Sequence, residues 1–85
     1  GQAKIVYFVE DPVDADAVIF FTTQPSWADK RVEFISNIYL EDGCSIYITD
    51  IPEEADEFWY QSEFRTSADL ILFETDYSYE VDEGC

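Results

Sequence analysis

Residues 4–16 read KIVYFVEDPVDAD, and residues 17–29, AVIFFTTQPSWAD, follow the same plan of an apolar run, a proline and a closing Ala-Asp pair. The Ala-Asp pair returns 40 residues after each of these, at residues 55–56 and 68–69. Continuing the 13-residue step, with one residue inserted at Gly43, places an aspartate at all six expected positions: Asp16, Asp29, Asp42, Asp56, Asp69 and Asp82. The sequence therefore predicts an array of six repeats.

The apolar run of each repeat predicts a strand of about five residues. An apolar residue stands ten positions before each aspartate: Val6, Ile19, Val32, Ile46, Trp59 and Leu72. The next residue is aromatic in every repeat but the third, where Glu33 is expected to face solvent at a sheet edge. In the first four repeats both faces of the run are apolar, which predicts strands covered on both sides. The last two repeats alternate and are expected to have one solvated face.

The roughly eight residues between runs predict a tight corner. Three of these segments carry Pro-x-x-Ala-Asp, and proline suits the first position of a helical turn. Asp11 is expected to cap the first turn, and residues of capping type stand near the same place in other repeats: Thr23, Ser36, Asp50 and Asp76. Only one helical turn fits. The predicted fold is mainly β, with six short strands joined by single helical turns, in two pseudo-symmetric halves at 4–42 and 45–82; parallel and antiparallel pairing both remain open.

The recurring aspartate has two interpretations. A carboxylate at the end of a helical turn opposes the helix dipole, so the structural interpretation is that it accepts hydrogen bonds from backbone N–H groups at the start of the next strand. The alternative is cation binding. Calcium loops place oxygen ligands at alternate residues around a glycine, and no such loop is written here. The aspartates are therefore predicted to be structural, and neither a metal nor another cofactor is expected.

Charge limits the classes of partner. Twenty acidic residues oppose four basic ones, giving a net charge of −16. Such a chain repels nucleic acid and anionic lipid and attracts basic proteins. No apolar run approaches the roughly 20 residues of a membrane span, and no signal peptide is visible, so no membrane association is expected and a cytoplasmic location is favoured.

The residues of chemical interest are few. The chain has no histidine and no glycine-rich phosphate loop, and Lys4 and Lys30 begin strands at solvated positions, so no enzymatic activity is predicted. Cys44 and Cys85 each follow a glycine and an acidic pair; a disulfide between them and two free thiols are both compatible with the sequence. Trp27 stands in a corner where other repeats have polar residues, which makes it a candidate contact residue, the alternative being that it folds over a sheet edge.

The Ala-Asp recurrence in phase, as in residues 7–16, 20–29 and 60–69, resembles the septoil-knot domain family over about residues 3–82. These are small, mostly bacterial domains of unknown function. The resemblance implies one domain over residues 1–85, threaded as a deep seven-crossing torus knot of short strands, with repeats at about 3–16, 17–29, 30–42, 43–56, 57–69 and 70–82. Glu41 and Val81 replace the alanine in the third and sixth repeats. The resemblance supplies no catalytic residues.

Two functions are compatible with these features. The first is a compact structural or protein-binding module whose acidic surface engages a basic protein. The second is a nucleic-acid mimic, whose carboxylates imitate phosphates and occupy a DNA- or RNA-binding protein. Rows of acids at phosphate-like spacing on one face would favour mimicry. The oligomeric state is left open.

Overall fold

The computed structural model describes residues 3–36 and 45–82, and this part of the chain is built from short strands and single 3-10 turns. The strands are β1 (Lys4–Phe8), β2 (Ala17–Phe21), β3 (Lys30–Ile35), β4 (Ser45–Ile48), β5 (Glu57–Gln61) and β6 (Leu70–Glu74). The turns are η1 (Pro12–Asp14), η2 (Pro25–Trp27), η3 (Pro52–Glu54), η4 (Arg65–Ser67) and η5 (Ser78–Glu80). The predicted mainly β chain of six strands, without long helices, is confirmed.

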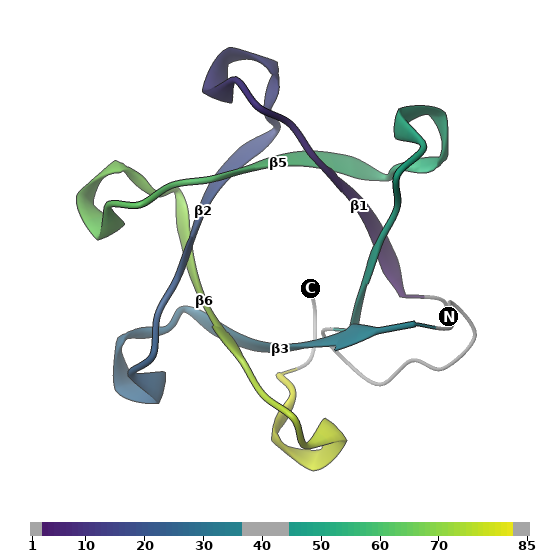
Figure 1. Cartoon of the computed structure of the whole chain (residues 1–85). Coiled ribbons are helices and arrows are strands. Elements are labelled where there is room, and N and C mark those ends of the chain that lie inside the picture. Colours follow the sequence, from purple (N-terminus) through teal and green to yellow (C-terminus); the bar gives the residue numbers. More distant parts are fainter. Residues whose placement is uncertain (1–2, 37–44, 83–85) are drawn as a thin grey trace.

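The strands form a closed barrel in the order β1-β4-β3-β6-β2-β5, in which β5 also pairs with β1. All six pairings are parallel. The strands run around a ring, and the 3-10 turns project from its periphery (Figure 1). Because β3 has a partner on each side, the predicted sheet edge at Glu33 is wrong: this residue lies opposite Ser45 within the β3–β4 ladder.

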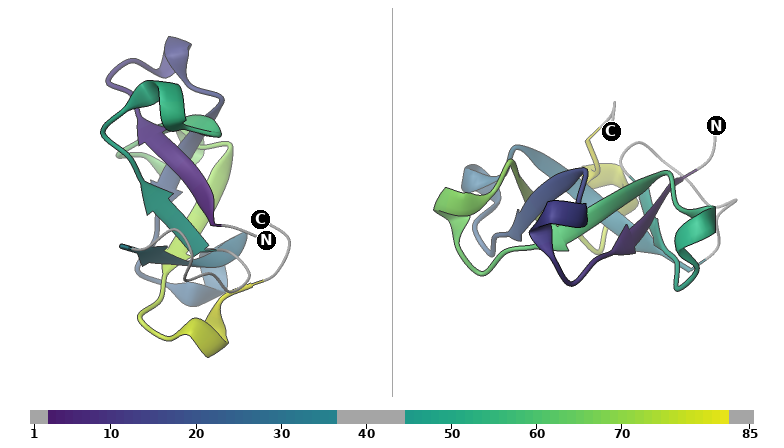
Figure 2. Two further views of the ribbon diagram at one scale, coloured as in Figure 1. Left: turned by 90° about the vertical axis from the view of Figure 1, so that its right-hand side faces the viewer. Right: turned by 90° about the horizontal axis from the view of Figure 1, so that it is seen from above.

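The two halves of the chain alternate around the ring. β1, β2 and β3 occupy every second place, and β4, β5 and β6 fill the gaps between them. Eight residues link β1 to β2, and the same number links β2 to β3, β4 to β5 and β5 to β6. This is shorter than the dozen or more residues that normally join neighbouring parallel strands. Each such connection instead turns a corner of the ring and advances two places in the same direction, leaving a gap for a strand of the other half (Figures 1 and 2).

A single layer of side chains fills the centre of the ring. It consists of the residues that stand ten positions before the recurring aspartates, and all are buried: Val6, Ile19, Val32, Ile46, Trp59 and Leu72. Trp59 therefore lies in the core together with the five aliphatic residues. Two residues further along three of the strands, aromatic rings cover this layer from one side. Phe21 lies 6.4 Å from Phe8 and 5.7 Å from Phe34 between ring centroids, within the range of favourable aromatic contacts.

Residues 3–36 and 45–82 form no second layer over the outer face of the barrel, although the sequence led us to expect one. The outward aromatic residues are only half-buried: Tyr7, Phe20, Tyr47, Tyr60 and Phe73. They are partly covered by neighbours in the same sheet, as where Tyr7 and Phe58 meet edge to face at 5.8 Å. The expectation that the first four strands are covered on both sides is therefore wrong, because a closed single-layer barrel buries only its inner face.

We predict that neither half of the chain folds alone, because every ladder joins a strand of the first half to a strand of the second. Residues 1–40 and 41–85, prepared as separate monomeric peptides, should give the narrow amide dispersion of an unfolded chain. The intact chain under the same conditions is the control. A cooperative unfolding transition in either monomeric peptide would contradict this prediction.

Candidate functional site

Each described recurring aspartate binds both backbone groups of one residue on a neighbouring strand. The N–H of Asp16 donates to the carbonyl oxygen of Phe58 at 2.7 Å, and Oδ2 of Asp16 accepts from the N–H of Phe58 at 2.8 Å. In a regular parallel ladder a backbone carbonyl would accept from this N–H. The residues just before the aspartate belong to the corner, so no backbone carbonyl is available to the N–H of Phe58. The aspartate side chain supplies the acceptor in its place and extends the ladder by one residue. We call this pair of bonds an aspartate clip.

The same clip closes four further corners. The pairs are Asp29 with Ile71, Asp56 with Ile5, Asp69 with Val18 and Asp82 with Arg31. The bound residue lies 42 or 51 positions away, on a strand of the other half, and not at the start of the next strand in the chain as expected. Asp42 lies outside the described residues, and so do Cys44 and Cys85, the candidate disulfide pair.

A second set of polar residues, missed at the sequence level, begins the corners. These side chains are buried at the ends of strands, and each hydroxyl oxygen accepts from the N–H two residues later, at 3.0 to 3.2 Å: Thr22, Thr49, Ser62 and Thr75. The hydroxyl residues recur in the 13-residue phase, and this was the available signal; Thr22, Thr49 and Thr75 each stand one position before a residue taken as a cap. Asp11 does cap η1, accepting from the N–H of Val13 at 3.0 Å. No side-chain cap hydrogen bond is present at η2, η3 or η4.

Trp27 lies on η2 at the periphery of the ring and is 55% exposed. The guanidinium carbon of Arg65, on η4, lies 4.6 Å from the centre of the Trp27 ring, a cation–π geometry. Phe64, beside Arg65 in the chain, is 66% exposed. We refer to Trp27, Phe64 and Arg65 as the arginine–aromatic patch. Folding over a sheet edge does not account for Trp27, because the sheet is closed.

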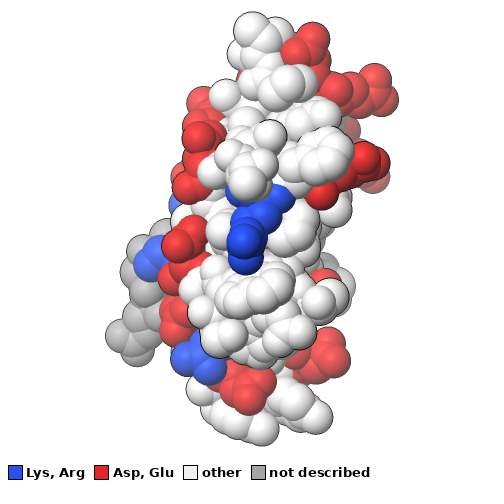
Figure 3. Space-filling model, turned by 90° about the vertical axis from the view of Figure 1, so that its left-hand side faces the viewer, with Lys and Arg blue, Asp and Glu red and all other residues white. Residues whose placement is uncertain are grey.

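Acidic side chains lie on both sides of this region. Because all the strands are parallel, the clip aspartates that precede them gather at one rim of the ring. Other exposed acids follow strand ends at the opposite rim: Glu10, Asp11, Asp50, Glu63 and Asp76. Figure 3 shows the side of the molecule that carries η2 and η4, where a strip of uncharged and a few basic side chains runs between two acidic bands.

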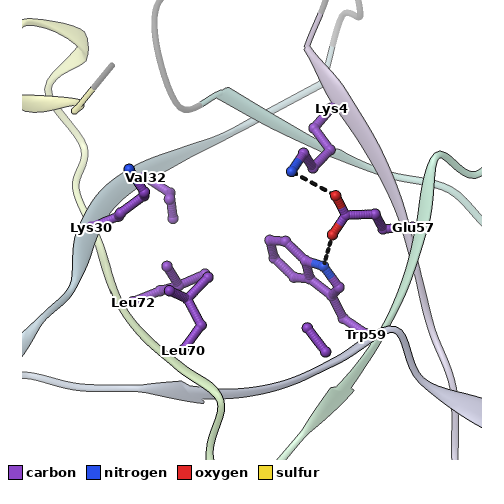
Figure 4. A pocket seen from close by; sticks show the side chains of 8 residues that line it. Lys4, Lys30, Val32, Glu57, Trp59, Leu70 and Leu72 are labelled. Carbon is purple, nitrogen blue, oxygen red and sulfur yellow. Dashed lines mark hydrogen bonds and ion pairs between the residues drawn. The ribbon is translucent and has the colours of Figure 1, made fainter. Parts of the chain in front are cut away.

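A pocket opens at the end of the ring where the strands begin. It has a volume of about 200 Å³ and is lined by the first residues of five strands and by three core residues: Lys4, Ala17, Lys30, Glu57, Leu70, Val32, Trp59 and Leu72. Lys4 and Lys30, expected at solvated positions, are half-buried in its wall. Figure 4 shows Lys30 on the opposite side of the pocket from Lys4 and Glu57, with the Trp59 ring between them.

Glu57 is held by two donors inside this pocket. Its Oε2 lies 2.7 Å from Lys4 Nζ, and its Oε1 accepts from Trp59 Nε1 at 2.8 Å. Burial raises the pKa of Glu57, but the hydrogen bonds from Lys4 and Trp59 and the charge of Lys4 outweigh it and leave the pKa below its usual value. Glu57 therefore stays ionised and neutralises Lys4.

Comparison with models of known protein families, with curated protein sequences and with solved structures found no match. Within residues 3–36 and 45–82, no three acidic or cysteine side chains converge as a set of metal ligands. None of the helical segments in that part of the chain has the length and apolar character that crossing a membrane requires. The geometry thus presents two candidate sites, the arginine–aromatic patch and the pocket.

We predict that Asp69→Ala lowers the free energy of unfolding by about 1 kcal/mol, because it removes a charged acceptor from the N–H of Val18. Asp14→Ala is the matched control: it removes the same charge from an exposed turn, and its carboxylate accepts no hydrogen bond within the described chain. This variant should stay within about 0.5 kcal/mol of the parent. Urea unfolding measures both. Equal losses in the two variants would show that the clip does not stabilise the fold.

We also predict that the Glu57 interactions lose their effect in acid. A carboxylate whose pKa is lowered by folding stabilises the native state above its unfolded pKa, and this stabilisation is lost as pH falls through the folded value. At pH 7, Glu57→Gln should unfold more easily than Glu63→Gln, an equal charge change at an exposed residue, by up to about 1 kcal/mol. The difference should disappear when both are measured well below pH 4. A difference that is unchanged or larger in acid would contradict this account.

Proposed function

We propose that this chain is a non-enzymatic protein-binding module that engages a basic partner through the arginine–aromatic patch. The observation that carries the proposal is the placement of Trp27: it is more than half exposed, it is stacked on Arg65, and its turn η2 lies on the side of the ring where two acidic bands are seen (Figure 3). Tryptophan and arginine are the residue types most enriched among those that dominate binding energy at protein interfaces. Acidic surroundings steer a basic surface towards the patch and repel acidic competitors.

The patch combines an apolar contact surface with acidic side chains on either side of it. The stacking against Arg65 holds the Trp27 ring, so that less side-chain freedom is lost when a partner binds. The ring and Phe64 supply apolar area, while the carboxylates on either side select for lysine and arginine in the partner. Because the patch lies on two corners that the ring fixes in place, it needs no rearrangement to bind.

The finer chain path belongs to the same proposal. Six 13-residue repeats, in two pseudo-symmetric halves, wind as a deep seven-crossing torus knot, as in the septoil-knot family that the sequence resembles. Support comes from the way in which the strands of one half fill the gaps left by the other. A knotted path would make the module compact and resistant to proteolysis, which suits a rigid scaffold for an exposed patch.

Nucleic-acid mimicry is the alternative, and the two acidic rims are the observation that favours it. The two acidic bands on the side of the molecule in Figure 3 would give a basic groove two lines of charge to bind. Mimicry makes no use of an exposed tryptophan, whereas protein binding through the patch depends on it. The two functions therefore predict different effects of substituting Trp27.

The test compares the parent chain with Trp27→Ala and with Val13→Ala, each immobilised and exposed to an extract of the native cells. Val13 is 82% exposed on another corner, so its substitution removes apolar surface outside the patch. We predict that the parent and Val13→Ala retain the same basic proteins, released by salt, and that Trp27→Ala retains at least tenfold less. Mass spectrometry identifies the proteins, and the binding of the purified partner to each variant is then measured.

The outcomes separate the proposals. Recovery of only nucleic-acid-binding proteins, displaced by DNA or RNA and indifferent to Trp27→Ala, would replace the proposed function with mimicry. Recovery of no basic protein would reject both.

A further inference from the structure

We propose that the pocket at the strand-start end of the ring binds a small apolar monocarboxylate. This inference is independent of the proposed partner binding, because none of the pocket residues belongs to the arginine–aromatic patch. It rests on the shape of the ring, on the balance of charge in the pocket wall and on the size of the cavity.

The two ends of the ring are filled differently. At the strand-end side, the rings of Phe8, Phe21 and Phe34 pack against the core layer. At the strand-start side the equivalent inward position in β2 is Ala17, whose small side chain leaves space beside Leu70. The floor of this space is formed by Val32, Trp59 and Leu72, so the cavity is apolar below and polar only at its rim (Figure 4).

Of the three charged side chains that line the pocket, one cation has no ion-pair partner within the described segments. Glu57 is neutralised by Lys4 and also hydrogen-bonded by the Trp59 indole. Lys30 forms no ion pair with any other residue of the described segments, and it lies across the pocket from that pair (Figure 4). Two of the four basic residues of a chain with net charge −16 thus line one pocket, where they accompany a single lining carboxylate; the clip aspartates at the same rim accept hydrogen bonds from backbone N–H groups of neighbouring strands.

The size of the cavity and the charges that line it define the class of ligand. A cavity of about 200 Å³ is somewhat larger than the roughly 150 Å³ apolar cavity that accommodates benzene, so it suits a ring or branched chain with a short arm. The apolar floor binds the body of the ligand, and Lys30 binds an anionic head at the rim. A single carboxylate fits better than a dianionic phosphate, because the negative charge of the whole chain repels each added charge of the ligand.

The experiment titrates the ¹⁵N-labelled chain with phenylacetate and, as a neutral probe of the same shape, phenylacetamide. The indole N–H resonance of Trp59 reports on the pocket and that of Trp27 serves as an internal control; a Trp27→Phe variant assigns the two. Phenylacetate is expected to shift the Trp59 resonance saturably with a dissociation constant on the order of 1–10 mM, as for a ligand of about ten heavy atoms. Phenylacetamide should bind several-fold more weakly, and the Trp27 resonance should not move.

Three variants test the assignment. Lys30→Gln should weaken phenylacetate about three- to tenfold and leave phenylacetamide unchanged. Arg31→Gln removes the same charge from the next residue of β3, which lies outside the pocket, and should bind both probes as the parent does. Ala17→Leu narrows the cavity and should weaken both probes. Amide dispersion confirms that each variant is folded.

The proposal is overturned if phenylacetate does not shift the Trp59 resonance saturably, or if the amide binds as tightly as the carboxylate. Equal losses for Lys30→Gln and Arg31→Gln would overturn it as well, because they would reflect net charge alone. If Lys30→Gln does not fold, unchanged binding of both probes by Ala17→Leu is sufficient to reject the pocket as the site.

Discussion

The structure depends on one constraint of pairing: every strand of the first half is hydrogen-bonded on both sides to strands of the second half. The eight-residue corners impose this arrangement, because a single 3-10 turn carries the chain to the place after next and leaves a gap that only the other half can fill. Among the described residues no ladder forms within a half, so the contacts that stabilise the ring join residues far apart in the sequence. Closing such long loops costs conformational entropy before any ladder is complete. We therefore expect slow and cooperative folding.

The aspartate clips show how so small a ring keeps its ladders complete. A strand of four to six residues forms few ladder hydrogen bonds, and at each corner one backbone N–H lacks the carbonyl acceptor that a longer strand would provide. The carboxylate restores the acceptor at that point, and a charged acceptor forms a stronger hydrogen bond than a carbonyl. The same choice adds a negative charge at each corner and contributes to a net charge of −16, whose self-repulsion opposes folding. The stabilising hydrogen bond acts over 2.7 to 2.9 Å, whereas the destabilising repulsion acts between distant corners. Salt therefore weakens the repulsion more than it weakens the hydrogen bond.

The sequence predicted the local structure and did not predict the partners. Proline and the ten-residue interval before each aspartate identified the corners and the buried residues, such as Ile19 and Leu72, because these depend on neighbours within one repeat. Nothing in one repeat specifies that Asp16 binds Phe58 and not a residue of the next strand, since that choice follows from closure of the ring. Closure also explains the two errors at strand level, the sheet edge at Glu33 and the second apolar layer. Both assumed an open sheet. The pocket was missed for the same reason: Lys30 is an ordinary strand-start lysine until the ring brings it opposite Glu57.

The ring separates the residues that determine the fold from those left to function. Within the described residues, the buried layer at the centre of the ring, with the clips and the hydroxyl groups at the corners, accounts for the closed barrel. The first residues of the strands, which line the pocket, are less restricted by the fold. Ala17, Lys30 and Leu70 differ in size and charge although they occupy equivalent places at the strand starts. The same holds for the last residues of the corner turns, where Asp14, Trp27 and Glu54 occupy equivalent places. Substitutions of these residues change neither the buried central layer nor the aspartate clips. They are the positions at which this architecture can acquire a ligand or a partner without loss of the ring.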